Sequence, residues 1–180
     1  MRALSLTAEW PVPTVAAAVV LPDGSVASIG DIDHPFRIAS IAKMLVGWTL
    51  LVATEEGTLS LDDPAGQAGC TVRHLLAHAG GYAFDGPDPI TRPGQRRIYS
   101  NTGIEIAADA LTAAAGMPYA DYQREALLEP LGMTATELRG SPAHAVRTTV
   151  RDLLTFVAEA EQKSADDVVA VLLNSVPFPA

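Results

Sequence analysis

Ser40 and Lys43 are the residues whose types and spacing point most directly to chemistry. They stand three positions apart at the start of an apolar segment, 40–56, which predicts a buried helix that ends at Gly57. Positions i and i+3 share one face of a helix, so the hydroxyl and the amine can touch. This is the arrangement of a serine nucleophile and its activating base. The alternative is that Lys43 extends to solvent from the first helical turn.

The triplet Tyr99-Ser100-Asn101 stands at the entrance of a second expected helix, 102–115, with Gly116 as its stop. Its side chains offer a phenol, a hydroxyl and an amide, all of which can exchange protons or hydrogen bonds with a substrate. Ser100 or Asn101 could equally be only the N-cap of that helix.

His74 and His78 lie four residues apart, a spacing that could bind a metal ion on one helix face. The zinc-protease pattern is absent, because no Glu occupies the second position and no third ligand is near. Structural histidines are the favoured interpretation, and no metal or organic cofactor is expected. The single cysteine, Cys70, excludes a disulfide framework within the chain.

The remaining elements follow from apolar patterns and from turn residues. Asp23-Gly24 between two apolar runs predicts a β-hairpin over 14–29. Thr71 is a good N-cap for a short helix over 72–77. Three later helices and three loops are also expected; the helices cover 119–128, from Thr148 or Thr149 to about 160, and 166–173, and the loops cover 58–69, 80–94 and 140–145.

Composition limits the classes of protein that fit. A chain of 180 residues with 48% hydrophobic residues and a mean hydropathy of +0.20 predicts one globular domain. The net charge of -9 argues against nucleic acid or an anionic membrane as partner. The apolar run 44–53 is too short to cross a bilayer, and Glu9, Pro11 and Pro13 interrupt the pattern of a signal peptide. A cytoplasmic protein is expected, or an exported one whose leader is missing from this chain.

Together, Ser40-Ile41-Ala42-Lys43 and Tyr99-Ser100-Asn101 resemble the first two active-site motifs of the serine β-lactamase and penicillin-binding-protein superfamily. The resemblance is closest to the class C-like branch, which includes D-Ala-D-Ala carboxypeptidases and esterases. It extends from about residue 14 to about residue 160. Framework segments agree with it as well, over 59–64, 72–81, 128–133 and 148–154.

The resemblance implies a role for each residue of the two motifs. Ser40 would attack a carbonyl or lactam carbon and become acylated. Lys43 would accept the serine proton, since partial desolvation favours its neutral amine. Tyr99 would be a second proton-transfer group, and Asn101 would orient Lys43 and bind the substrate amide. Whether Lys43 or Tyr99 is the general base is left open.

The resemblance also implies an α+β fold of the β-lactamase and transpeptidase type, with an N-terminal hairpin and a predominantly helical region. The family's third motif, on a late strand, supplies a second oxyanion donor and binds the substrate carboxylate. No stretch after Asn101 matches this motif, so the C-terminal strands of the sheet are expected to be missing. Losing one oxyanion donor costs about a hundredfold to a thousandfold in rate.

The expected organisation is a single, incomplete domain over 1–180. It comprises N-terminal strands and a loop over 1–39, the helical region with the motifs over 40–160, and an atypical tail over 161–180. A partner chain or self-association could complete the sheet.

Two functions remain in competition. The first is a serine hydrolase that acts through a Ser40 acyl-enzyme on an amide, lactam or ester, with activity impaired by truncation. The second is a catalytically inactive binding or scaffold protein of the same fold. The choice among β-lactams, D-Ala peptides and esters depends on the missing strands and on the loop 82–93, which has no readable signature.

Overall fold

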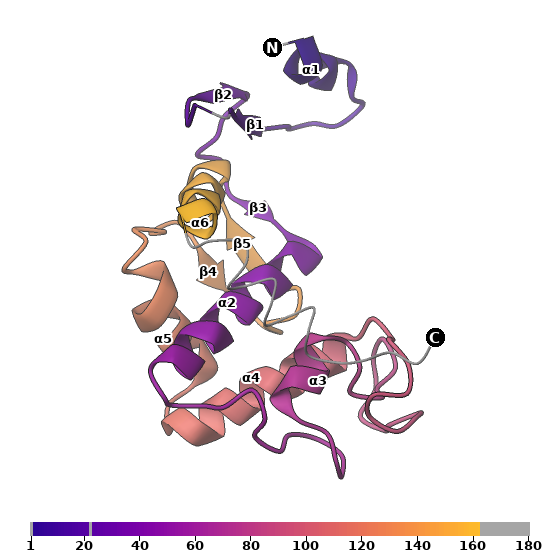
Figure 1. Cartoon of the computed structure of the whole chain (residues 1–180). Helices are drawn as coiled ribbons and strands as arrows, with labels where there is room; N and C mark the ends of the chain where they lie inside the picture. Colours follow the sequence, from indigo (N-terminus) through magenta and orange to yellow (C-terminus); the bar gives the residue numbers. More distant parts are fainter. Residues whose placement is uncertain (1, 22, 163–180) are drawn as a thin grey trace.

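The computed structural model describes residues 2–21 and 23–162 (Figure 1). Its helical elements are α1 (Arg2–Ser5), η1 (Leu6–Glu9), η2 (Ala39–Ile41), α2 (Ala42–Glu55), α3 (Val72–Leu76), α4 (Asn101–Ala115), α5 (Tyr119–Gln123), η3 (Arg124–Leu128) and α6 (Val150–Gln162). Its strands are β1 (Ala17–Val20), β2 (Val26–Ile29), β3 (Phe36–Arg37), β4 (Glu137–Leu138) and β5 (Val146–Thr148). The helix expected over 166–173 lies outside the described residues.

The predicted N-terminal hairpin is confirmed. Strands β1 and β2 pair antiparallel from Ala17 opposite Ile29 to Val20 opposite Val26. Gly24 has a φ of 79°, which glycine adopts at little cost, so it closes the turn that the Asp-Gly pair predicts. The hairpin lies at one end of the molecule, where β1 contacts α6 (Figure 1).

Helix α2 is the central element of the body of the molecule (Figure 1). On one side it packs on α4 and α5, and Val46 and Leu50 are fully buried there. On the other side Leu45 and Trp48 pack on residues of β5 and α6, with the Trp48 ring edge-on to Phe156 at 5.5 Å. Because α2 is enclosed on two sides, its sequence is apolar around most of its circumference. Burying a leucine of this kind contributes about 1.5–3 kcal/mol to stability.

A three-stranded sheet in the order β3-β5-β4 was not predicted from the sequence. Its strands are two or three residues long, too short to show an alternating pattern. Phe36 lies opposite Thr148, and the N–H of Ile38 donates to the carbonyl of Val146 at 3.1 Å. This sheet therefore fixes the segment that leads into Ser40 against a strand that follows it by more than a hundred residues.

The helix expected over 119–128 forms in two parts, α5 followed by the π-helical turn η3. The N–H of Glu129 bonds to the carbonyl of Arg124, five residues earlier, at 2.9 Å. The wider turn allows the consecutive residues Leu127 and Leu128 both to be buried, at 2% and 6% exposed. Helices α2, α3, α4 and α6 agree with the expected ranges to within one or two residues, apart from the 3₁₀ turn η2 that precedes α2.

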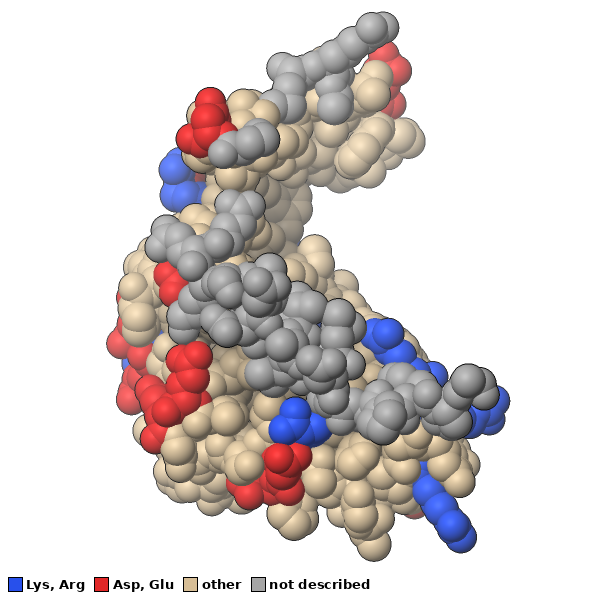
Figure 2. Space-filling model, in the orientation of Figure 1, with Lys and Arg blue, Asp and Glu red and all other residues tan. Residues whose placement is uncertain are grey.

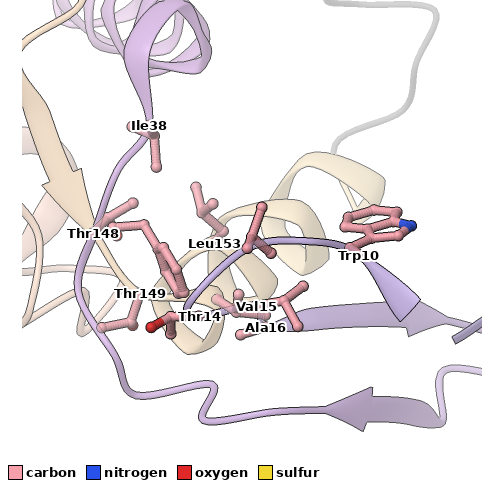
Figure 3. A pocket seen from close by; sticks show the side chains of 11 residues that line it. Trp10, Thr14, Val15, Ala16, Ile38, Thr148, Thr149 and Leu153 are labelled. Atoms are coloured by element: carbon pink, nitrogen blue, oxygen red, sulfur yellow. The ribbon is translucent and has the colours of Figure 1, made fainter. Parts of the chain in front are cut away.

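An apolar groove of about 310 Å³ lies between the N-terminal segment and the start of α6 (Figure 3). Trp10 and Val12 stand on its wall with 57% and 50% of their surfaces exposed. We call this surface the N-terminal groove; its lining residues are Trp10, Val12, Thr14, Val15, Ala16, Phe36, Ile38, Thr148, Thr149, Val150 and Leu153. Over residues 2–21 and 23–162, no helix combines the length and the apolar character that a membrane span requires.

Candidate active site

Ser40 lies in the 3₁₀ turn η2, directly ahead of α2, and its side chain is exposed. Ala39, immediately before it, has a φ of 47°, a left-handed conformation that costs a non-glycine residue of the order of 1–3 kcal/mol. Ile41 and Met44 beside it are 48% and 58% exposed. The hydroxyl is therefore accessible to a substrate, on a turn whose backbone the small sheet holds in place.

Lys43 is half-buried and its Nζ makes three hydrogen bonds. The acceptors are Ser40 Oγ at 3.1 Å, Asn101 Oδ1 at 2.7 Å and the carbonyl oxygen of Ala143 at 2.9 Å. The contact expected between hydroxyl and amine is present. Lys43 therefore does not extend into solvent, which was the alternative interpretation of the sequence.

Tyr99 forms the opposite wall, 46% exposed, with the Lys43 Nζ at 4.8 Å from its ring centroid. Burial raises the pKa of the phenol, but hydrogen bonds with Ser40 and Lys43 and the positive charge of Lys43 outweigh burial. The net pKa of Tyr99 lies below its ordinary value. The phenol of Tyr99 therefore loses its proton more readily than a tyrosine in water does.

His78 packs behind Tyr99, with ring centroids 4.5 Å apart. Its Nδ1 accepts a hydrogen bond from the N–H of Ser100 at 3.2 Å. Burial lowers the pKa of His78 to about 4, and the positive charges of Lys43 and Arg97 add to this effect. At neutral pH the ring is therefore uncharged and supports Tyr99 without adding a second cation beside Lys43.

Ser100 and Asn101 divide the roles that the sequence left open. Ser100 is the N-cap of α4, because its Oγ accepts from the N–H of Gly103 at 2.9 Å. The side chain of Asn101 is thereby left for the site, where Oδ1 accepts from Lys43. Its Nδ2 donates to Asp85 Oδ1 at 2.9 Å, and the residue is only 5% exposed. Asn101 thus contacts Lys43 as expected, while little of its surface is open to a substrate.

The contribution of Ala143 was missed in the sequence. It comes from the loop 140–145, where Ser141 Oγ donates to the carboxylate of Glu105 on α4 and accepts from the N–H of Ala143 at 3.2 Å. These bonds hold the Ala143 carbonyl against Lys43. A backbone acceptor in a loop leaves no signature in residue types, so no feature of the sequence identified it.

Asp85 was also missed, because it stands in the Gly- and Pro-rich loop 82–93 among several exposed polar residues. The signal that could have found it is positional: this loop ends shortly before the Tyr99 triplet and must run past it.

Other polar residues singled out in the sequence have structural roles. His74 forms a capping box with Thr71 at the start of α3, with its Nδ1 2.9 Å from Thr71 Oγ1. Burial raises the pKa of the Cys70 thiol to about 11, so it is not a reactive thiolate at neutral pH. Within the described part of the chain, no group of three or more His, Cys, Asp or Glu side chains could hold a metal ion.

The chain belongs to the beta-lactamase family. The family model of that description matches residues 7–174, nearly the whole sequence. The α+β fold of the β-lactamase and transpeptidase type that the motifs implied is thereby confirmed, together with the relationship to penicillin-binding proteins.

Individual relatives support the same assignment. A β-lactamase of known structure from Mycobacterium bovis is 42% identical, with a TM-score of 0.88 over 93% of this chain and 64% of the other. A D-alanine carboxypeptidase from Burkholderia cenocepacia, 24% identical, shares the fold with a TM-score of 0.77 over 93% of this chain and 65% of the other. The D-alanyl-D-alanine-carboxypeptidase/endopeptidase AmpH of Escherichia coli is 27% identical over 67% of this chain. The match spans 41% of the length of AmpH.

Proposed function

We propose that the chain is a serine hydrolase that works through an acyl-enzyme on Ser40. The observation that carries the proposal is the Lys43 Nζ, which contacts Ser40 Oγ at 3.1 Å while two further acceptors hold it. In the acylation step Ser40 Oγ would attack a carbonyl carbon and lose its proton, and the leaving group would take up a proton as its bond breaks. Water would then release the acyl group and regenerate the serine.

The neighbours of Lys43 favour it as the general base. A neutral amine has two N–H groups and one lone pair. The carbonyls of Asn101 and Ala143 can only accept hydrogen bonds, so they take the two N–H groups. The lone pair is then directed at the Ser40 hydroxyl, which is the orientation that proton abstraction needs.

Tyr99 is suited to be the second proton-transfer group. Its ring lies 4.8 Å from the Lys43 Nζ, and the influence of Ser40 and Lys43 outweighs burial, so its pKa lies below the ordinary value. It would pass a proton between Lys43 and the leaving group. The neutral His78 ring behind it keeps the phenol in place.

The substrate class follows from the family and stays broad: an amide, a lactam or an ester. AmpH, by its name, is a D-alanyl-D-alanine carboxypeptidase and an endopeptidase, so a D-Ala-D-Ala peptide is the first amide to test. A β-lactam and a simple ester complete the set.

Intact-mass spectrometry tests the proposal on the native chain. After exposure to a fluorophosphonate and, separately, to a β-lactam, we expect an added mass on the peptide that contains Ser40. Ser40→Ala should carry no adduct, and Lys43→Ala should label at least a hundredfold more slowly, since general-base catalysis contributes about 10²–10⁴ in rate.

Ser60 provides a matched control, because it is an exposed serine outside the site. Ser60→Ala should label like the native chain. An adduct that persists in Ser40→Ala, or a folded native chain that takes up neither probe, would refute the serine-hydrolase proposal and favour a non-catalytic role.

A further inference from the structure

Two short segments lie side by side along the wall of the site, residues 83–85 and residues 99–101. Ser100 Oγ donates to the carbonyl of Ala83 at 2.6 Å, and the N–H of Asn101 donates to the carbonyl of Phe84 at 2.7 Å. The ring of Phe84 stacks on Tyr99 with centroids 6.1 Å apart. Asp85 adds a further contact between the two segments, because its Oδ1 accepts a hydrogen bond from Asn101 Nδ2 at 2.9 Å.

The bond to Asp85 decides which way the amide of Asn101 faces. An asparagine amide is nearly symmetric in shape, and its neighbours determine which end is the oxygen. A carboxylate can only accept, so Asp85 selects the orientation in which Nδ2 faces the loop and Oδ1 faces Lys43. Lys43 in its protonated form favours the same orientation.

The reverse orientation would damage the proposed reaction. With Nδ2 turned toward a neutral Lys43, the amide would donate to the amine lone pair and compete with Ser40 for it. A neutral lysine would not by itself prevent this, since an amine can accept as well as donate. Asp85 therefore acts at the step where Lys43 must be uncharged.

We propose that Asp85 is a positioning residue, which fixes the amide of Asn101 so that the lone pair of Lys43 remains directed at Ser40. The inference rests on the proposed function and assigns a task to the loop 82–93. Asp85 does not contact Ser40 in the structure and acts only through Asn101.

A first test reads the Asn101 amide directly and does not need activity. The chain has two asparagines, Asn101 and Asn174, so selective ¹⁵N-asparagine labelling gives two side-chain signals. In the native protein we expect slow hydrogen exchange at Asn101 Nδ2, because the amide is buried and bonded at both ends. Asp85→Ala should accelerate this exchange, and Asp85→Asn, which keeps an acceptor oxygen, should accelerate it less.

Asp88 supplies the matched control: it is an exposed aspartate of the same loop. Asp88→Ala removes the same charge without touching Asn101, so its amide exchange and its labelling should be native. Unchanged exchange at Asn101 in Asp85→Ala would overturn the proposal, as would an equal effect of Asp88→Ala.

The second test is the rate of fluorophosphonate labelling of Ser40 across pH. A charged hydrogen bond of this kind supports about a tenfold effect, so Asp85→Ala should label about ten times more slowly on the plateau at high pH. Asp85→Asn should recover much of that loss. If Asp85 acted only through its negative charge, Asp85→Ala and Asp85→Asn would shift the pH profile of labelling by the same amount, and the labelling rate at high pH would not change. That result would also refute the positioning role.

Failure of this proposal and failure of the proposed function give different results. A native chain that does not label at Ser40 refutes the hydrolase, whereas the amide exchange still reports whether Asp85 holds Asn101. If the native chain and Asp85→Ala label equally fast at the same thermal stability, the hydrolase proposal is retained and the role of Asp85 is refuted.

Discussion

At Lys43, the donor and acceptor properties of the neighbouring atoms restrict what the amine can do. Two of its three partners accept only, and the third is the serine hydroxyl. His78 nearby accepts a hydrogen bond from Ser100 at Nδ1 and stays neutral. A protonated His78 would lose that bond and would place a second positive charge close to Lys43. The state of His78 therefore links the site to pH.

His78 makes stability depend on pH in a defined window. Its pKa is about 4 in the folded chain, below the ordinary value of about 6.5 for an unfolded histidine. Between these values the unfolded chain binds more protons, so the contribution of His78 is complete above about pH 6.5 and is lost as the pH falls toward 4. In His78→Asn we expect the unfolding free energy to rise less steeply between pH 4 and 6.5. The slope should fall by an amount that corresponds to at most about one proton bound on unfolding.

Asparagine suits this substitution because His78 has a φ of 57°, a conformation that Asn tolerates. Denaturant unfolding at several pH values measures the slope for both proteins. His34→Asn is the control, an exposed histidine away from the site, and its slope should not show the same change. Identical slopes for the native chain and His78→Asn would contradict the buried, neutral histidine.

The side-chain motifs of the site could be predicted, whereas its backbone and loop partners could not. Ser40 and Lys43 stand three residues apart and Asn101 stands at a helix start, so residue type and spacing were enough to predict that these side chains meet. Ala143 contributes a carbonyl, which every residue type possesses. Asp85 sits in a loop whose path depends on tertiary contacts. Local periodicity in the sequence therefore does not predict that either residue belongs to the site.

At the scale of elements, α4 carries more of the site than its N-terminus suggests. It presents Asn101 to Lys43 from its first turn, and one turn later Glu105 holds Ser141 of the loop 140–145. Two of the three acceptors of Lys43, Asn101 Oδ1 and the Ala143 carbonyl, are thus held in place by α4. The long helices were predictable from apolar periodicity. The strands β3, β4 and β5 were not, because two or three residues contain no period, and β3 pairs with a strand more than a hundred residues away.

Breaking the contact between Glu105 and Ser141 should loosen the Ala143 carbonyl. In Ser141→Ala we expect a loss of about 1.5–3 kcal/mol in unfolding free energy, because a hydrogen bond to a charged group is removed, together with slower labelling of Ser40. Glu105→Ala should have effects of similar kind. Because both variants remove one contact, the double variant should be less impaired than the sum of the two. Additive effects in this mutant cycle, measured by denaturant unfolding and by labelling rate, would show that the contact does not hold the loop.

At the scale of the whole molecule, two apolar pockets lie where the N-terminal segment and the hairpin meet α6, and Figure 3 shows one of them. Within the described residues, β1 and β2 form a two-stranded sheet, and its contact with α6 supplies packing that a hairpin alone in water would lack. The matched relatives extend beyond the part aligned with this chain, which spans 64% of the Mycobacterium bovis structure.

Charge over the molecular surface opposes close approach of two copies. Figure 2 shows acidic side chains gathered on the left and lower parts of the face in view, with basic side chains mainly on the right. With a net charge of -9 on each chain, repulsion between copies is long-range and is screened by salt. The apolar groove and the charge therefore act in opposite directions on self-association, and salt weakens only the repulsion.

We predict that the chain self-associates through the N-terminal groove, which two copies can share in an isologous contact. Light scattering coupled to size-exclusion chromatography should give a mass that rises with concentration, and rises further when salt screens the charge. Trp10→Ser combined with Val12→Ser should shift the chain toward monomer, because both side chains are exposed on the groove. Leu6→Ser is the control, since Leu6 is 58% exposed but does not line the groove. A monomer at every concentration and salt would refute the prediction, and an equal effect of Leu6→Ser would place the contact elsewhere.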